Sequence, residues 1–161
     1  MLEGENLTNG DLVGTKDGSA YGLVFDPQDE NVFYFSNNDK HCIYKYDLRT
    51  KECACWAGQE GKSGYLDGPI GQAMFNKPGQ MCVDSEGNII LTDTENHCIR
   101  KITMSTGYVS TLAGKPQNSG YVNGSAEDAQ FKKPLGICID NDDVMYIGDS
   151  ENRAIRRLAV E

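Results

Sequence analysis

A repeat of 56 residues is the feature that most constrains the fold of this chain. Residues 64–102 and 120–158 align without gaps at that offset, and 14 of their 39 positions are identical. Self-similarity at a fixed period is typical of repeat architectures, in which each unit buries its apolar surface only against its neighbours. The chain is therefore expected to be a row of similar units.

A more diverged copy precedes these two. The tripeptide at 41–43, "HCI", recurs unchanged at 97–99, which is the same offset of 56. The stretch "LVFDPQDENVFYFSN" needs two extra residues to align with its later counterpart. We expect the insertion at "PQDEN", because the tip of a hairpin tolerates added residues.

Each unit is expected to form four short strands. In the middle unit, runs of apolar and β-branched residues are separated by the turn-forming stretches "SEG", "TENH" and "MSTG". The expected strands are 80–84, 88–93, 98–103 and 108–112. Four antiparallel strands in every repeat predict the blades of a β-propeller, and the Gly and β-branched content excludes a helical solenoid.

The predicted fold class is all-β, with about three propeller blades of four antiparallel strands in one domain covering residues 1–161. The blades are expected at about 20–58, 79–114 and 135–161, with connectors at 59–78 and 115–134.

The pattern "DG-x4-A-x-F-x2-P", followed by "NIILTDTENHCIRKI" and "VSTLAG", resembles the NHL repeat. Both complete copies carry it and the first copy carries it weakly, so the resemblance covers nearly the whole chain from about residue 20. It implies a β-propeller that serves as a protein-binding platform, an RNA reader, an extracellular sensor or adhesion domain or, in one branch, a metal-dependent amidating lyase. The spacing and the "GYLDG" connectors look like bacterial extracytoplasmic NHL proteins, often from Bacteroidetes.

Ring closure leaves two alternatives open. NHL propellers usually have about six blades, and three blades cannot close a ring, since propellers need roughly four to eight. Either further blades belong to a larger protein, or two copies form a homodimer that closes a six-bladed ring. In the second case the N-terminal "MLEGENLTNGDLVG" is expected to supply the missing outer strand of the last blade. This N-terminus has neither the basic nor the apolar region of a signal peptide.

The charge and hydropathy of the chain argue against two kinds of partner, nucleic acid and the membrane interior. The chain has 24 acidic and 15 basic side chains, a formal charge of −9. Nucleic acid is not expected as a partner, because each phosphate contact needs Lys or Arg. No run approaches the roughly 20 apolar residues of a membrane span.

The six cysteines are expected to remain free thiols. Four of them occupy two repeated positions in successive units, and such positions rarely approach closely enough for a disulfide. The other two form a C-x-C within a strand and lack zinc spacing. The three pairs are Cys42 and Cys98, Cys82 and Cys138, and Cys53 and Cys55.

Six polar residues keep their places in the two closer copies. A ring of carboxylates binding a metal or substrate is one interpretation. We favour a structural role, because a residue repeated in every blade serves each blade, and because Asn37 replaces the aspartate in the first copy. The arginine of each copy is expected to pair with an aspartate of its own or the adjacent blade. These positions are Asp93 and Asp149, Asn96 and Asn152, and Arg100 and Arg156.

Four aromatic residues form the possible ligand surface: Tyr65, Tyr121, His41 and His97. The alternatives are packing for the tyrosines and exposed turn positions for the histidines. A zinc site needs three or four ligands, and the third copy has Arg153 at the histidine position. We therefore expect no metal, no cofactor and no catalytic residue in this chain.

The sequence thus favours a non-enzymatic binding module that presents propeller loops and a central channel to a protein or glycan ligand. The alternative is part of a propeller enzyme, a metal-dependent lyase or hydrolase whose catalytic residues lie in blades outside this chain.

Overall fold

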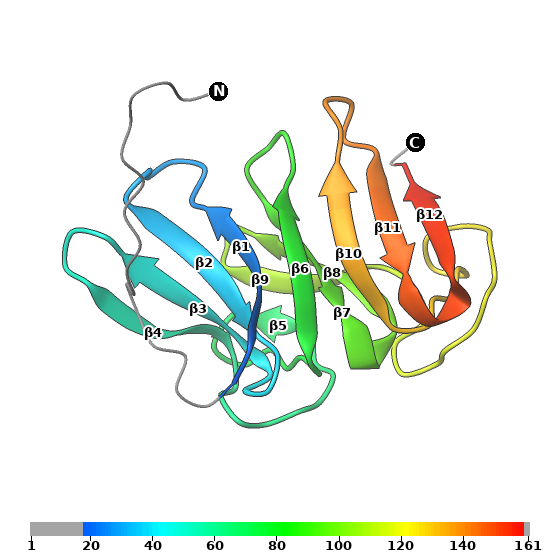
Figure 1. Cartoon of the computed structure of the whole chain (residues 1–161), viewed down its shortest axis with the longest axis horizontal. Coiled ribbons are helices and arrows are strands. Elements are labelled where there is room, and N and C mark those ends of the chain that lie inside the picture. The colour runs from blue at the N-terminus through cyan, green and yellow to red at the C-terminus, as the bar shows by residue number, and fades with distance from the viewer. Residues whose placement is uncertain (1–17, 160–161) are drawn as a thin grey trace, which may run out of the picture.

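The computed structural model describes residues 18–159, which form three antiparallel sheets of four, five and three strands (Figure 1). Consecutive strands pair with one another in each sheet, so the prediction of all-β propeller blades is confirmed. The first sheet holds β1 (Ala20–Phe25), β2 (Val32–Asn37), β3 (Cys42–Asp47) and β4 (Glu52–Gly58). The second holds β6 (Pro78–Val83), β7 (Ile89–Asp93), β8 (Cys98–Thr103) and β9 (Tyr108–Ala113), with β5 (Gly68–Pro69) beside β9. The third holds β10 (Pro134–Ile139), β11 (Met145–Asp149) and β12 (Ala154–Leu158).

An aspartate closes the first hairpin of every blade. Asp84 follows β6, and its Oδ1 accepts the Asn88 N–H at 2.7 Å across the loop. Asp140 accepts the Val144 N–H at 3.0 Å in the third blade. Short side chains that bond to nearby backbone amides favour turns over continued strands, so the repeated aspartate sets where the inner strand ends.

The inner strands β1, β6 and β10 lie beside one another along the row of sheets (Figure 1). Two hydroxyls fasten neighbouring blades, since Ser36 Oγ donates to Gly79 O at 2.6 Å and Thr92 Oγ1 donates to Leu135 O at 2.8 Å. A Cβ on Gly22 would come within 2.8 Å of the Gln80 backbone, so the approach of β1 to β6 requires glycine there.

The core consists of apolar layers between successive sheets. Phe75 and Ile43 are completely buried between the first two sheets, and Phe131 and Ile99 occupy the corresponding places between the second and third. Phe75 and Phe131 both come from connectors, and each fills the space between two blades. Burying one such side chain contributes roughly 2–3 kcal/mol, so the connectors are part of the core.

The third sheet has no fourth strand among the described residues. The outer edge of β12 corresponds to the edge of β8 that pairs with β9 in the second blade. The N-terminal stretch expected to supply this strand lies outside the described residues. In the part of the chain that the structure covers, no helix is long and apolar enough to span a membrane.

Candidate ligand-binding surface

A buried ion pair joins the second and third strands of the middle blade. Arg100 Nη1 lies 2.6 Å from Asp93 Oδ2, and both side chains are fully buried. Asn96 Nδ2 donates to the same carboxylate oxygen at 2.8 Å, and the Asn76 N–H donates to Oδ1 at 2.8 Å. Asp93 therefore accepts three hydrogen bonds in a site closed to water.

Arg100 also holds the connector that arrives from the first blade. Its Nη1 donates to Met74 O at 3.0 Å, and its Nη2 donates to Leu66 O at 2.9 Å and Asp67 Oδ1 at 2.8 Å. The guanidinium carbon lies 4.7 Å from the ring centre of Tyr65, a favourable cation–π geometry. These contacts fix the connector against the blade.

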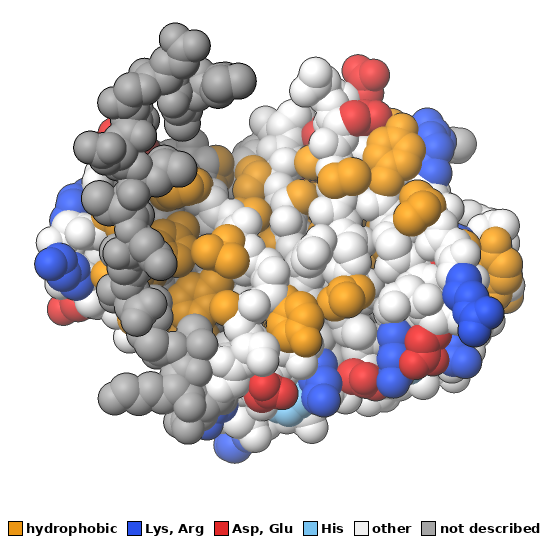
Figure 2. All heavy atoms as spheres, viewed as in Figure 1, with side chains coloured by type: hydrophobic (Ala, Val, Ile, Leu, Met, Phe, Trp, Pro, Cys, Tyr) orange, Lys and Arg blue, Asp and Glu red, His pale blue; other side chains and the backbone are white. Residues whose placement is uncertain are grey.

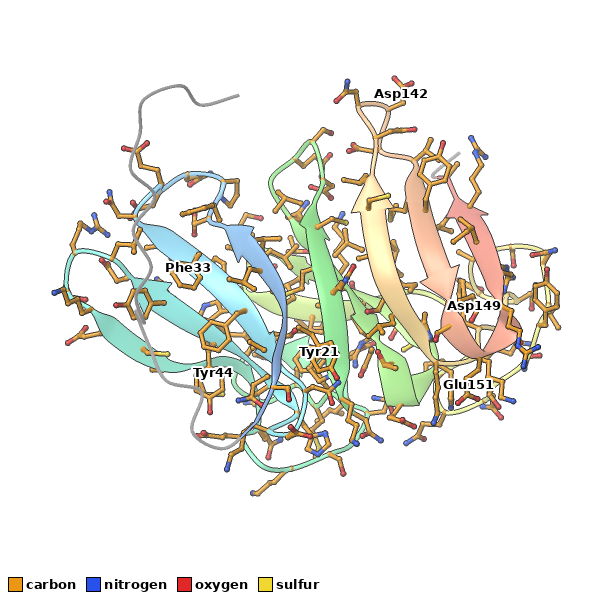
Figure 3. The ribbon with its side chains drawn as sticks, viewed as in Figure 1. Tyr21, Phe33, Tyr44, Asp142, Asp149 and Glu151 are labelled. Carbon is orange, nitrogen blue, oxygen red and sulfur yellow. The ribbon has the colours of Figure 1, made fainter. Side chains whose placement is uncertain are left out.

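The third blade repeats this arrangement. Arg156 Nη1 lies 2.8 Å from Asp149 Oδ2, and the Asn152 amide bridges the same oxygen and Gly120 O at 2.7 Å each. Arg156 Nη2 donates to Val122 O at 2.7 Å in the second connector. Figure 3 shows Asp149 at the end of β11, close to Glu151. All six repeated polar residues thus make contacts inside the fold.

The first blade lacks this network. Asn37 and Tyr44 occupy the positions of Asp93 and Arg100, as the register of β2 with β3 shows. Tyr44 stacks on Phe35 with ring centres 5.3 Å apart. Aromatic side chains of this blade, including Tyr21, Phe33 and Tyr44, gather on one side of the first sheet (Figures 2 and 3).

Burial changes the acidity of Asp93. Loss of solvent raises the pKa of its carboxyl group to about 6, while Arg100 and the amide donors act in the opposite direction. The guanidinium at 2.6 Å and the two amide donors favour the ionised carboxylate, so Asp93 remains a partner for Arg100.

Each of the two histidines holds the next connector through its ring. His97 adopts a left-handed conformation with φ 56° at the end of the 3-10 turn η1 (Thr94–Asn96). Its Nδ1 accepts the Lys133 N–H at 3.0 Å, and His41 Nδ1 accepts the Lys77 N–H at the same distance. The left-handed residue is thus the one that follows Asn96, where the chain leaves the turn.

Histidine neutrality makes the stability of the fold depend on pH. Burial lowers the pKa of His97 and of His41 below the ordinary 6.5. Lys77 adds to this effect at His41, whereas Glu95 opposes it at His97. A depressed folded pKa means that the neutral rings stabilise the fold above that ordinary value and that this contribution is lost as the pH falls. Between pH 7 and pH 5 we expect this histidine contribution to the free energy of unfolding to be lost, whereas the raised pKa of Asp93 acts in the opposite direction over the same range.

His97→Asn is expected to reduce this loss by about half, because one of two equivalent titrating groups is removed and asparagine tolerates a left-handed backbone. The measurement is a pair of urea titrations at each pH. A pH dependence identical to that of the native chain would contradict the assignment.

Charged residues line one edge of the molecule, visible at the bottom of Figure 2. Lys133 Nζ lies 3.3 Å from a carboxylate oxygen of Glu95 and 3.3 Å from one of Glu151, so it bridges two blades. Exposed pairs of this kind contribute little to stability. They do keep this edge polar.

An open groove of about 400 Å³ lies between Tyr65 and the second connector. The phenol of Tyr65 is fixed by a 2.6 Å hydrogen bond with Thr111 Oγ1 and forms one wall. Leu112, Lys115 and Asn118 line the rest, together with Glu127 on the far side. Of the four predicted surface residues, only Tyr65 lines this groove; Tyr121 is 61% exposed elsewhere, with its ring over Arg156.

Sequence reasoning missed the other groove residues because the two connectors differ there. "GQEGKSG" precedes Tyr65, whereas "GKPQNSG" precedes Tyr121. A residue that binds one ligand is expected to differ from its counterpart in the other repeat. The difference between the two connectors was therefore the sequence feature that could have indicated these residues.

The structure also brings Cys42 beside Cys55, a pair that the repeat alignment did not consider. The hydrogen bond between their thiols raises the pKa of Cys42 and lowers the pKa of Cys55. All six cysteines are free. Within residues 18–159, no three His, Cys, Asp or Glu side chains are placed to hold a metal ion.

Known proteins share both the repeat and the fold. Residues 75–102 match the NHL repeat model. NHL repeat-containing protein 2 of Gallus gallus is 30% identical over 93% of this chain and 19% of its own length. A Bacteroides thetaiotaomicron protein of unknown function is 31% identical, with a TM-score of 0.84 over 92% of this chain and 38% of that one. An auxiliary nutrient binding protein from Bacteroides ovatus is 28% identical, with a TM-score of 0.79 over 94% of this chain and 40% of that one.

The chain spans less than half the length of each of these relatives. In the second and third blades an arginine bonded to an aspartate holds the preceding connector, and we call this arrangement the arginine clamp (Arg100 with Asp93, and Arg156 with Asp149). The repeated clamp, the four-strand blades and the match to the repeat model agree with one another. The chain belongs to the NHL repeat family of β-propeller proteins.

Proposed function

We propose that this chain is part of a non-enzymatic binding propeller that takes its ligand in the groove beside Tyr65. The proposal rests on a difference between two groups of polar residues, those that bond to the connectors and those that line the groove. Arg100, Asp93 and their counterparts are occupied with the connectors. By contrast, the polar groove residues Lys115, Asn118 and Glu127 correspond to Gln59, Lys62 and Gly71 in the preceding repeat. Residues that differ between repeats are free to be specific for one ligand.

Oligosaccharides are the ligand class that best fits the groove, and a protein loop is the alternative. The groove has a volume of about 400 Å³, which lies within the usual range for small-molecule sites. A tyrosine ring held in place offers an apolar face to a sugar ring, while Lys115, Asn118 and Glu127 offer donors and acceptors for its hydroxyls. The similarity to an auxiliary nutrient binding protein supports a small soluble ligand.

The test is isothermal titration calorimetry with purified cello-, xylo-, manno- and chito-oligosaccharides. Binding of at least one class is expected, and Asn118→Ala is expected to weaken it tenfold or more, which corresponds to about 1.4 kcal/mol. Lys62→Met is the matched control, since Lys62 is exposed on the other connector. If no oligosaccharide binds, or if both variants bind like the native chain, the proposed glycan site is wrong.

The recovered sugar is also examined by mass spectrometry. An unchanged ligand is expected of a binding module. Cleavage of the bound sugar would instead favour the hydrolase alternative that the sequence left open.

A further inference from the structure

The groove beside Tyr65 contains four polar side chains, and the bonds that they already make decide what they can offer a ligand. They are a phenol, an amide, a carboxylate and an ammonium, belonging to Tyr65, Asn118, Glu127 and Lys115. A hydroxyl whose proton is used inside the protein presents only its lone pairs to the outside. The donors and acceptors that remain therefore define the chemical class of the ligand.

The phenol proton of Tyr65 is used inside the protein. The phenol oxygen lies 2.6 Å from Thr111 Oγ1 and 3.3 Å from Asp67 Oδ2, while Thr111 Oγ1 lies 3.1 Å from Asp67 Oδ1. An ionised carboxylate only accepts hydrogen bonds. If the short contact between the hydroxyls and the carboxylate each receive a proton, Tyr65 donates either to Thr111 or to Asp67. Burial raises the pKa of this phenol above the ordinary 10, so the proton is present at neutral pH. Tyr65 Oη is therefore an acceptor for a ligand.

Asn118 and Glu127 supply two further acceptors. Asn118 Nδ2 donates to Pro116 O at 2.9 Å, which orients the amide because its oxygen could not face that carbonyl. Oδ1 and one N–H of Asn118 are left for a ligand. Glu127 makes no hydrogen bond or ion pair with any residue in the range 18–159. The groove thus has three acceptors against one free amide N–H.

The rim of the groove has more carboxylates than cations. Among the described residues, Lys115 is the one cation that lines the groove, and its Nζ lies 3.8 Å from Asp128 Oδ1, beside the lining. Glu127 and Asp128 therefore stand beside a single ammonium. Since this ammonium is directed to Asp128, the negative charge of Glu127 is left for a ligand.

The wall formed by Tyr65 also has a negative excess behind it. Asp93 Oδ2 lies 2.6 Å from Arg100 Nη1, and Asp67 Oδ1 lies 2.8 Å from Arg100 Nη2, so two carboxylates share one guanidinium. Arg100 itself lies 4.7 Å from the ring centre of Tyr65. Both sides of the groove therefore favour a cation, because opposite charges attract more strongly where the protein partly excludes water.

The carboxylates at the rim belong to the second connector alone. At the repeat offset of 56, residues 127 and 128 correspond to Gly71 and Gln72, and Asn118 corresponds to Lys62. The same place in the first connector thus has a cation and lacks both carboxylates. Because both connectors fold in the same way, the fold does not require the negative charge of this groove.

Building on the function proposed above, we propose that the groove beside Tyr65 binds the protonated amine of an amino sugar, so that its ligands are glucosamine-type oligosaccharides. A primary ammonium has three N–H donors and no acceptor. It complements three acceptors in a negative environment, and hydrogen bonds between charged groups are stronger than neutral ones. A hydroxyl or an N-acetyl group brings an acceptor of its own and no charge, so it matches this groove less well.

Three tetrasaccharides with the same β-1,4-linked backbone separate the amine from the sugar ring. Cellotetraose has a hydroxyl at C2, chitotetraose has an N-acetyl group there, and the glucosamine tetramer has a free amine. Calorimetry is performed with the full chain in a buffer that keeps the amine protonated. The glucosamine tetramer is expected to bind at least about tenfold more tightly than the other two.

The outcomes distinguish this proposal from the glycan site itself. Equal binding of the three tetrasaccharides, or binding of neutral sugars alone, overturns the preference for an amine and leaves the glycan site in place. If no oligosaccharide of any series binds, both proposals are wrong. An oligolysine peptide is titrated as well, and tighter binding of this peptide than of the glucosamine tetramer would overturn the assignment to a sugar.

Glu127→Gln tests the carboxylate directly. The change removes one negative charge at nearly constant size, and circular dichroism is expected to be unchanged because Glu127 has no partner among the described residues. Affinity for the glucosamine tetramer is expected to fall about tenfold, while affinity for cellotetraose stays the same. Glu30→Gln is the matched control, since Glu30 is exposed between β1 and β2 and the net charge changes equally. A preference for the amine that survives Glu127→Gln, or that falls equally in Glu30→Gln, contradicts the proposal.

Discussion

Replacing Arg100 with methionine is expected to lower the free energy of unfolding by about 3–5 kcal/mol, because it leaves a buried partner charge unpaired. Arg100 is fully buried and is the only cation within bonding distance of Asp93 among the described residues. The substitution also leaves Leu66 O without its 2.9 Å donor and frees the connector from the blade.

Urea titration followed by circular dichroism measures this effect. Arg49→Met is the matched control, since Arg49 pairs with Asp29 and Asp47 on the surface, where solvent screens the attraction. Its urea midpoint is expected to stay close to that of the native chain. Equal effects of the two substitutions would show that the buried network is not what holds the blade together.

Phe75→Ala is expected to cost about 3–5 kcal/mol, the usual range for removing a buried aromatic ring. Phe75 is completely buried, packs between the first two sheets and lies 5.0 Å from the Arg100 guanidinium. Its loss opens a cavity at the contact between two blades, and it also removes one ring from the clamp.

Trp56 offers a local probe for this variant. It is the only tryptophan of the chain, lies on β4 and packs against Tyr34 with ring centres 4.3 Å apart. We expect its fluorescence in Phe75→Ala to change at lower urea than the circular dichroism, since the first blade loses its hold on the second. Phe25→Ala is the control, because Phe25 is 60% exposed. Coincident transitions in Phe75→Ala at the native midpoint would contradict the expectation.

The strands could be predicted from the sequence because turn residues mark their ends locally. The predicted strand 98–103 agrees with β8 (Cys98–Thr103), and the run 108–112 extends by one residue in β9. The predicted inner strand began at 80, two residues after the start of β6, because Pro78 pairs with Asp93 beyond a bulge. Local patterns do not show such an irregularity.

The clamp was only partly predictable. Pairing of arginine with aspartate follows from their repetition, but the partners Leu66 O and Met74 O are backbone atoms that carry no sequence signal. Lys115 and Asn118 escaped prediction for the opposite reason, because nothing repeats there. The repeat reveals what every blade shares; what one blade does alone requires the positions of its atoms.

Each arginine of the clamp contacts a segment that precedes it in the chain. Arg100 holds a connector carbonyl 34 residues before it, and Arg156 does the same in the following unit. On a ribosome, each connector therefore stays unsecured until β8 or β12 of its own unit has been made. A force applied to the C-terminus would release Arg156 before Arg100, so these blades are expected to detach singly, in the reverse order of their synthesis.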